Sequence, residues 1–172
     1  MKKIVLMIVA LTMTVAAKAQ YYRLETPFTA GKYFVGASLS GLNLNYSGAN
    51  DLSFGVQAQG GLMVDDNVLV YATVGFDNNG KGCDAFTAGV GGRYYIEQNG
   101  IFLGLNANYK HIQPSYNDLM PGVEVGYAFF LSRTVTIEPA VYYNQSFKSH
   151  SEYSGLGLRV GIGIYLDKLI KL

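Results

Sequence analysis

The sequence has almost no cysteine, since Cys83 is the single one among its 172 residues. One thiol cannot form an internal disulfide, so the fold must be stable without that cross-link. Cys83 also lies far from the N-terminus, which excludes a lipid-anchored start of the mature chain. No Ser/Pro-rich linker, block of charge or long-period repeat divides the sequence, so its length predicts a single domain.

Long apolar runs are also missing, except at the N-terminus. Residues 4–15 form an apolar core that is too short to span a bilayer comfortably, and two lysines precede it. Ala17 and Ala19 then supply the small side chains that signal peptidase requires. The sequence therefore predicts a signal peptide over residues 1–19, cleavage before Gln20, and an exported domain over residues 20–172.

Positive charge is scarce as well. The whole chain holds 13 Lys and Arg against 12 Asp and Glu, and the predicted signal peptide removes Lys2, Lys3 and Lys18. The mature chain keeps 10 basic and 12 acidic residues, a net charge of −2. This balance argues against a nucleic-acid partner, which would need a basic surface.

Strict alternation of apolar with small or polar residues takes the place of these missing features. Such a period of two indicates β-strands with two unlike faces. In residues 52–64 one face carries Leu52, Phe54, Val56, Ala58, Leu62 and Val64. The pattern predicts eight strands, and most of them reach the length that a tilted membrane-spanning strand needs. Their ranges are 33–42, 52–64, 68–76, 85–96, 101–109, 121–131, 134–143 and 153–166.

The connections between these strands alternate between long and short. Residues 43–51, 77–84, 110–120 and 144–152 read as long polar loops. Residues 65–67, 97–100 and 132–133 read as tight turns. In an antiparallel up-and-down barrel, this alternation places all long loops at one rim, as in transmembrane barrels.

Charged residues almost vanish from the strands. The four that remain share the Gly/Ser/Thr/Asn/Gln face, and they are Arg93, Glu124, Glu138 and Arg159. A face without charge on every strand is unsuited to water, so we expect the apolar faces to meet lipid and the barrel to close. Aromatic residues at the ends of the apolar faces fit interfacial girdles. These residues are Phe76, Phe86, Tyr109 and Tyr143 near the long-loop rim, and Tyr94 and Phe129 near the other.

The interior of an eight-stranded barrel is just wide enough for side chains to fill it. We expect the four charged residues to form a balanced lumen charge network, because buried charges require partners. Glu138 and Arg159 lie on adjacent strands at similar depth, and we predict an ion pair between them. Glu124 could join this pair, with Arg93 lower on the opposite side. The network has two interpretations, namely a structural filling of the lumen or an electrostatic gate over a narrow path.

The signal peptide, eight alternating segments, four long loops and charged lumen resemble the small eight-stranded outer-membrane β-barrels of Gram-negative bacteria. The OmpA transmembrane domain, the OmpX-type barrels and the porin-family barrel proteins are examples. The resemblance covers about residues 32–166 and is one of architecture, with residues 155–166 similar to the strand that the barrel assembly machinery reads. The chain ends six residues after Leu166, so the peptidoglycan-binding domain of the OmpA plan is not expected.

This resemblance implies an integral outer-membrane barrel that contributes to envelope structure and contacts external partners through its long loops. The implied partners are outer-membrane lipids, lipopolysaccharide and the assembly machinery. No enzymatic activity, cofactor or metal is expected. A narrow channel for ions or small solutes is one alternative function, and a lipid A-modifying enzyme is another.

An enzyme of that kind would need a Ser–His pair with an acidic partner. The candidate pairs are His111 with Ser115, and His150 with Ser149, Ser151 and Glu152. Both histidines fall in predicted loops, which favours the interpretation that they are solvated loop residues and not catalytic ones. The loop over residues 77–84 lacks the acid spacing of a calcium site, and Pro139 within a predicted strand requires a β-bulge or a displaced strand boundary.

Overall fold

The computed structural model describes residues 27–45, 50–51, 54–78, 84–96, 100–112, 116–148 and 154–167. The predicted signal peptide lies outside these residues. They form ten strands: β1 (Tyr33–Asn45), β2 (Asn50–Asp51), β3 (Phe54–Asp65), β4 (Val68–Asn78), β5 (Asp84–Tyr95), β6 (Ile101–Ile112), β7 (Tyr116–Tyr127), β8 (Phe129–Phe130), β9 (Val135–Asn144) and β10 (Gly155–Leu166). Within the part of the chain that the structure describes, no helix is long and apolar enough to cross a membrane.

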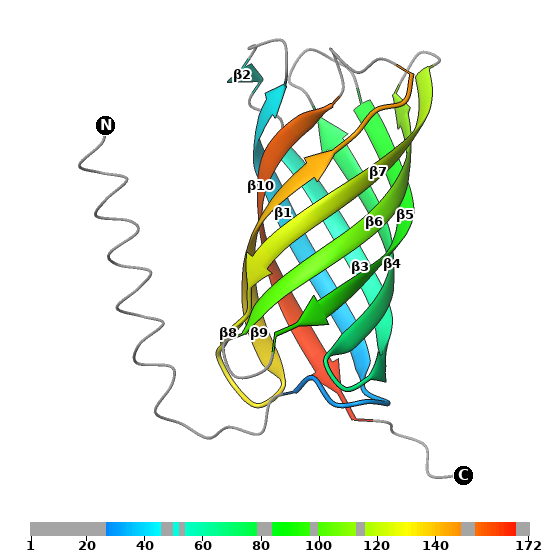
Figure 1. Ribbon diagram of the computed structural model, residues 1–172. Helices are drawn as coiled ribbons and strands as arrows, with labels where there is room; N and C mark the ends of the chain where they lie inside the picture. Colours follow the sequence, from blue (N-terminus) through cyan, green and yellow to red (C-terminus); the bar gives the residue numbers. More distant parts are fainter. Residues whose placement is uncertain are drawn as a thin grey trace, which may run out of the picture.

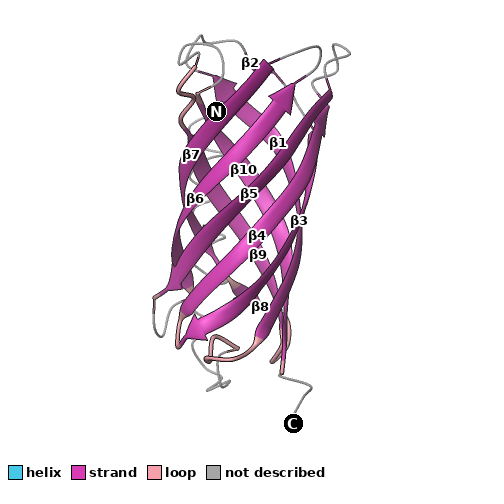
Figure 2. Cartoon of the chain, turned by 90° about the vertical axis from the view of Figure 1, so that its right-hand side faces the viewer, coloured by secondary structure: helices cyan, strands magenta, loops and turns pink. Residues whose placement is uncertain are grey.

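The strands close into a barrel (Figure 1). β2 and β8 hold two residues each, which leaves eight long strands. These eight pair antiparallel in the order β1-β3-β4-β5-β6-β7-β9-β10, and β10 also pairs with β1. Closure pairs the backbone groups that an open sheet would leave at its edges. The predicted all-β, antiparallel up-and-down fold is therefore confirmed, and Figure 2 shows the strands tilted across the barrel axis.

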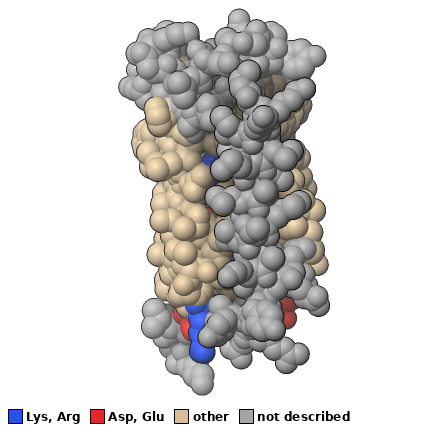
Figure 3. Space-filling model, turned by 90° about the vertical axis from the view of Figure 1, so that its left-hand side faces the viewer, with Lys and Arg blue, Asp and Glu red and all other residues tan. Residues whose placement is uncertain are grey.

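The alternation in the sequence corresponds to the outward and inward faces of the barrel wall. Val90 on β5 is 60% exposed, whereas Arg93, three positions further along the same strand, is 3% exposed. The same alternation runs along β3 and β10. In the space-filling view, the described surface between the rims is almost free of charge, and acidic and basic atoms gather at the lower rim (Figure 3).

The described turns, between β3 and β4 and between β8 and β9, and both ends of the described chain share the lower rim of Figure 1. Tyr33 pairs with Leu166, and the Lys32 ammonium lies 3.5 Å from the Asp167 carboxylate. Asp66 and Asn67 form the predicted turn between β3 and β4, and Asn67 adopts a φ of 65°. Asparagine tolerates this left-handed conformation better than most residues do, which suits it to a two-residue hairpin turn.

One predicted loop is wrong. Residues 110–120 were expected to form a long polar loop, but β6 continues to Ile112 and β7 begins at Tyr116. Lys110 pairs across this hairpin with Asp118, and His111 pairs with Asn117. Polar residues beyond the apolar band can continue a ladder in water, so the loss of apolar alternation marks the edge of the band rather than the end of the strand.

Pro139 lies inside β9 without a bulge. Its carbonyl oxygen points toward Gly126 of β7, so its ring nitrogen faces the same neighbour. The ladder on that side is interrupted there, because Gly126 pairs with Ala140 and pairing resumes only at Phe129 with Ile137. The missing N–H of proline therefore falls where β7 ends and β8 begins, while β9 pairs without a break with β10.

Candidate functional site

The candidate site lies in the lumen, where four different strands each contribute one charged side chain. β5 carries Arg93, β7 carries Glu124, β9 carries Glu138 and β10 carries Arg159. All four are less than a tenth exposed. They point inward because each occupies the small and polar register of its strand.

Arg93 is the centre of this lumen charge network. Its Nε lies 2.6 Å from Glu124 Oε1 and its Nη1 lies 2.8 Å from Glu138 Oε2. Its Nη2 also donates a hydrogen bond to Gln59 Oε1 at 3.1 Å. One guanidinium therefore bridges both buried carboxylates, a geometry for which its planar fork of donors is suited.

Arg159 pairs with Glu124 through the second carboxylate oxygen. The predicted ion pair between Glu138 and Arg159 is therefore wrong, because Glu138 is bound by Arg93 instead. In the ladder between β9 and β10, Glu138 is level with Gly161 and Arg159 is level with Ala140. The ion pairs therefore form between side chains that reach across the lumen, and not between those at similar depth on neighbouring strands.

Aromatic and hydroxyl groups surround the charges. The Arg93 guanidinium carbon lies 4.9 Å from the Tyr71 ring centroid and 4.8 Å from that of Phe102. Tyr71 donates its hydroxyl proton to Glu124 at 3.3 Å. Tyr165 and Thr136 both donate to Glu138 Oε1, at 2.9 and 2.7 Å. The two acids and two bases balance, so the network is neutral as a set.

An aromatic floor packs in the lumen below the network, and sequence reasoning missed its central residue. Phe28 precedes the first strand and inserts into the lower mouth, where it is 3% exposed. Its ring stacks on Tyr95 with centroids 3.9 Å apart and meets the Tyr165 ring edge-on at 5.3 Å. The Tyr95 and Tyr165 hydroxyls lie 2.8 Å apart. We define the aromatic floor as Phe28, Phe34, Tyr95, Phe102 and Tyr165.

The segment that carries Phe28 is fixed by hydrogen bonds to the end of β3 and to the turn between β3 and β4. Asn67 N donates to Phe28 O at 2.8 Å, and Gly31 N donates to Met63 O at 2.7 Å. Ala30 N donates to Asp66 Oδ1 at 2.9 Å. Gly31 adopts a φ of 85°, which turns the chain from the floor into β1. A glycine between an aromatic residue and the first strand was the available signal in the sequence.

The upper lumen, on the long-loop side of the network, is lined by small and polar side chains. Asn108 donates to Asn106 Oδ1 at 2.8 Å, and the Lys110 ammonium lies 3.4 Å from the Asp77 carboxylate. Glycines let neighbouring side chains lie against the wall, since a Cβ at Gly89 would stand 2.2 Å from Asn108 Oδ1. We define the upper lumen as Ser40, Thr73, Thr87, Asn106, Asn108, Asp77 and Lys110 with the glycines between them.

The candidate catalytic residues are only partly described. His111 Nδ1 lies 2.5 Å from Asn117 Oδ1, so this ring nitrogen is bound to a side-chain amide. Ser115, the loop with His150 and Cys83 lie outside the described residues. Among the residues that are described, no group of three or more His, Cys, Asp or Glu could hold a metal ion.

Solved structures show the same architecture. Neisserial surface protein A shares 16% identity with a TM-score of 0.60, covering 78% of this chain and 97% of its own. The N-terminal β-barrel domain of Pseudomonas aeruginosa OprF shares 9% identity with a TM-score of 0.60, covering 80% and 98%. The outer membrane protein AlkL, solved in lipid bilayers, shares 13% identity with a TM-score of 0.55, covering 88% and 98%.

The chain has the fold of the small eight-stranded outer-membrane β-barrels. No protein-family model matches the sequence, and no curated protein matches it. The likeness therefore concerns architecture, and the role must be argued from the wall, the lumen and the rims.

Proposed function

We propose that this chain is an integral outer-membrane barrel with a closed lumen, which contributes to envelope structure and presents its long-loop rim to the exterior. It is exported by residues 1–19 and inserted by the barrel assembly machinery. The proposal assigns it no enzymatic activity. The lipid-facing part rests on the wall, where large apolar side chains such as Leu105 (68% exposed) would be unfavourable in water.

The packing of the lower lumen is the observation that supports the non-conducting role. Arg93 binds two carboxylates across the interior, and the aromatic floor packs beneath it. An ion crossing the barrel would have to break a charge-assisted network and displace stacked rings. Both changes are costly in a low-dielectric interior.

A narrow channel is the second candidate, favoured by the polar lining of the upper lumen. Such a lining lowers the cost of bringing water or ions into the upper half. The two candidates differ at the charge network and the floor, because a channel requires an opening there.

Two measurements test the proposal. Membrane fractionation with heat-modifiable gel migration is expected to place the protein in the outer membrane as a folded barrel. Recovery as a soluble periplasmic protein without a heat-dependent shift would overturn the membrane role. In planar bilayers the purified protein is expected to show no sustained openings. Sustained openings of the wild type, with a conductance that changes in a folded Arg93→Met variant, would instead establish the channel.

A further inference from the structure

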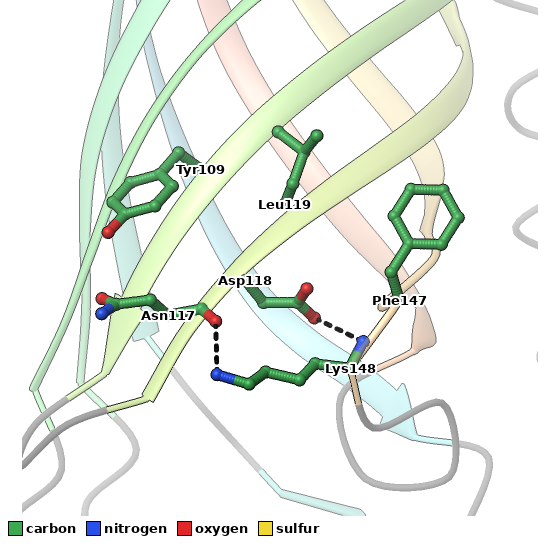
Figure 4. Close-up of a pocket in the computed structure, with 6 residues that line it drawn as sticks. All are labelled: Tyr109, Asn117, Asp118, Leu119, Phe147 and Lys148. Atoms are coloured by element: carbon green, nitrogen blue, oxygen red, sulfur yellow. Dashed lines mark hydrogen bonds between the residues drawn. The ribbon is translucent and has the colours of Figure 1, made fainter.

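An open pocket of about 380 Å³ lies on the outer wall at the long-loop rim. It is formed by the end of β6, the start of β7 and the segment that follows β9. Six residues line it: Tyr109, Asn117, Asp118, Leu119, Phe147 and Lys148 (Figure 4). We call this feature the rim pocket. It is separate from the lumen, because its exposed side chains belong to the outward register.

The rim pocket changes from apolar to polar within one step of the ladder. Tyr109 pairs across β6 and β7 with Leu119, and the next outward pair toward the rim is His111 with Asn117. Tyr109 and Leu119 are about half exposed, and Phe147 is 72% exposed. In Figure 4 these three apolar side chains lie on the side away from the strand ends, whereas Lys148 and Asn117 lie toward them. In the proposed membrane role, this change from apolar to polar falls where the hydrocarbon layer meets the headgroups.

Buried contacts hold the segment that presents Phe147 and Lys148. Asp118 is 6% exposed and accepts hydrogen bonds from the Ser146 hydroxyl and from Lys148 N, the latter at 3.5 Å. Ser146 N donates to Ser154 Oγ at 2.8 Å. The Lys148 ammonium reaches across to Asn117 O at 3.4 Å. The pocket is thus fixed by the fold on the lumen side, while its apolar and cationic groups face outward.

We propose that the rim pocket binds a phosphate-bearing lipid of net negative charge from the surrounding leaflet. The Lys148 ammonium and the Asn117 side-chain amide would hold the phosphate, and the acyl chain would lie against Tyr109, Leu119 and Phe147.

The pocket also contains the Asp118 carboxylate, but this group is buried and accepts hydrogen bonds from Ser146 and from Lys148 N, so the charge at the exposed side is the Lys148 ammonium. Ammonium groups near the membrane surface attract anionic headgroups, which supports this occupant. Without its predicted signal peptide the chain carries a net charge of −2, so the attraction comes from this local arrangement. The inference rests on the proposed membrane role.

Lys110 provides a matched control within the same rim. It carries the same charge at the end of β6, but it points into the lumen and pairs with Asp77 at 3.4 Å. If the overall positive charge of the rim held the lipid, the loss of either lysine would weaken lipid binding. A lipid held in the rim pocket would respond only to the loss of Lys148.

The test measures lipid binding by native mass spectrometry of the folded barrel in a neutral detergent. The probes are dioleoyl phosphatidic acid, dioleoyl phosphatidylcholine and inorganic phosphate. We expect the wild type to bind phosphatidic acid about tenfold more tightly than phosphatidylcholine, the range of one charge-assisted contact. Lys148→Gln should remove most of this preference, whereas Lys110→Gln should keep it. Phe147→Ala should weaken the binding of both lipids by about threefold, because apolar contact with the acyl chain is lost.

Three results would overturn the inference. They are an unchanged preference in Lys148→Gln, an equal loss in Lys110→Gln, or inorganic phosphate binding as tightly as phosphatidic acid, which would indicate a site for free anions. Heat-modifiable migration of each variant separates these results from misfolding. A folded barrel without lipid preference contradicts the rim pocket alone, whereas absence from the membrane contradicts the proposed function itself.

Discussion

The two halves of the lumen are lined by different kinds of side chain. The lower half holds the aromatic floor and the charge network, with Tyr95, Phe102 and Tyr165 fully buried. The upper half holds hydroxyls, amides and glycines, and Asn108 Oδ1 there has no protein partner among the described residues; at the junction of the two halves Gln59 Nε2 has none either. Such groups need water as their partner. The lower half is therefore a packed core, and the upper half has the character of a hydrated vestibule.

This contrast indicates where the proposed barrier to ions lies. In most small proteins one core supplies stability and a separate cleft supplies access to solvent. Here the interior of one barrel provides both the packed core and the polar space. The change from one to the other occurs at Arg93, whose guanidinium contacts the Phe102 ring of the floor and the side-chain amide of Gln59. Changes below this level should act on stability and closure, whereas changes above it should act on neither strongly.

The largest expected effect comes from Glu124. Glu124→Ala leaves the guanidinium groups of Arg93 and Arg159 in the lumen with Glu138 as the remaining carboxylate of the network, so we expect a loss of about 3–5 kcal/mol in the free energy of unfolding. Urea titration of the barrel in lipid vesicles measures this loss. Glu124→Gln combined with Arg159→Gln removes one charge of each sign and should recover part of the stability. A loss below about 1 kcal/mol for Glu124→Ala would show that water reaches the network.

Removal of the floor's central ring should have the next largest effect. Phe28→Ala deletes a buried ring, which costs about 3–5 kcal/mol in a rigid core. We expect about 2–3 kcal/mol here, because the segment can undock without unfolding the barrel. In planar bilayers the variant should show more frequent brief openings than the wild type. Tyr33→Ala, at an exposed position on the same stretch of chain, is the control and should remain closed.

The smallest effect is expected in the upper lumen. Asp77→Asn removes the partner of Lys110 in a pair whose lysine side chain is 24% exposed. Partly hydrated pairs of this kind contribute about 0–1 kcal/mol. The same urea titration should therefore give a midpoint close to that of the wild type. A loss as large as that of Glu124→Ala would mean that the upper lumen is a second packed core, and the contrast between the halves would fail.

The sequence predicted the faces of the wall better than the contacts across the lumen. Alternation alone determines which side chains point inward, so Arg93 and Glu124 were placed on the correct face. The partner of Arg159 depends on strand tilt and on side chains from non-neighbouring strands, which a one-dimensional pattern does not contain. The loop predicted over residues 110–120 failed for a different reason, because β pairing extends beyond the apolar band that alternation detects.

The floor was missed because it lies outside the periodic part of the sequence. Phe28 is a single aromatic residue before the first strand, and its partners Tyr95 and Tyr165 come from β5 and β10. Pro139 was puzzling for a similar reason, since the sequence shows the missing donor but not which neighbour that donor would face. Both features depend on which distant strands the barrel brings together.

The position of Phe28 also imposes an order on maturation. Its ring packs between Tyr95 of β5 and Tyr165 of β10, and Phe130 lies 5.5 Å away. These partners come from the middle and the end of the chain and meet only after β10 has joined β1. Phe28, the first of the floor's residues to be translated, can stack on Tyr95 early but completes its ring contacts only once the last strand is in place. Its full docking thus joins the start of the described chain to its final strand, and a fully buried Phe28 ring reports a finished barrel.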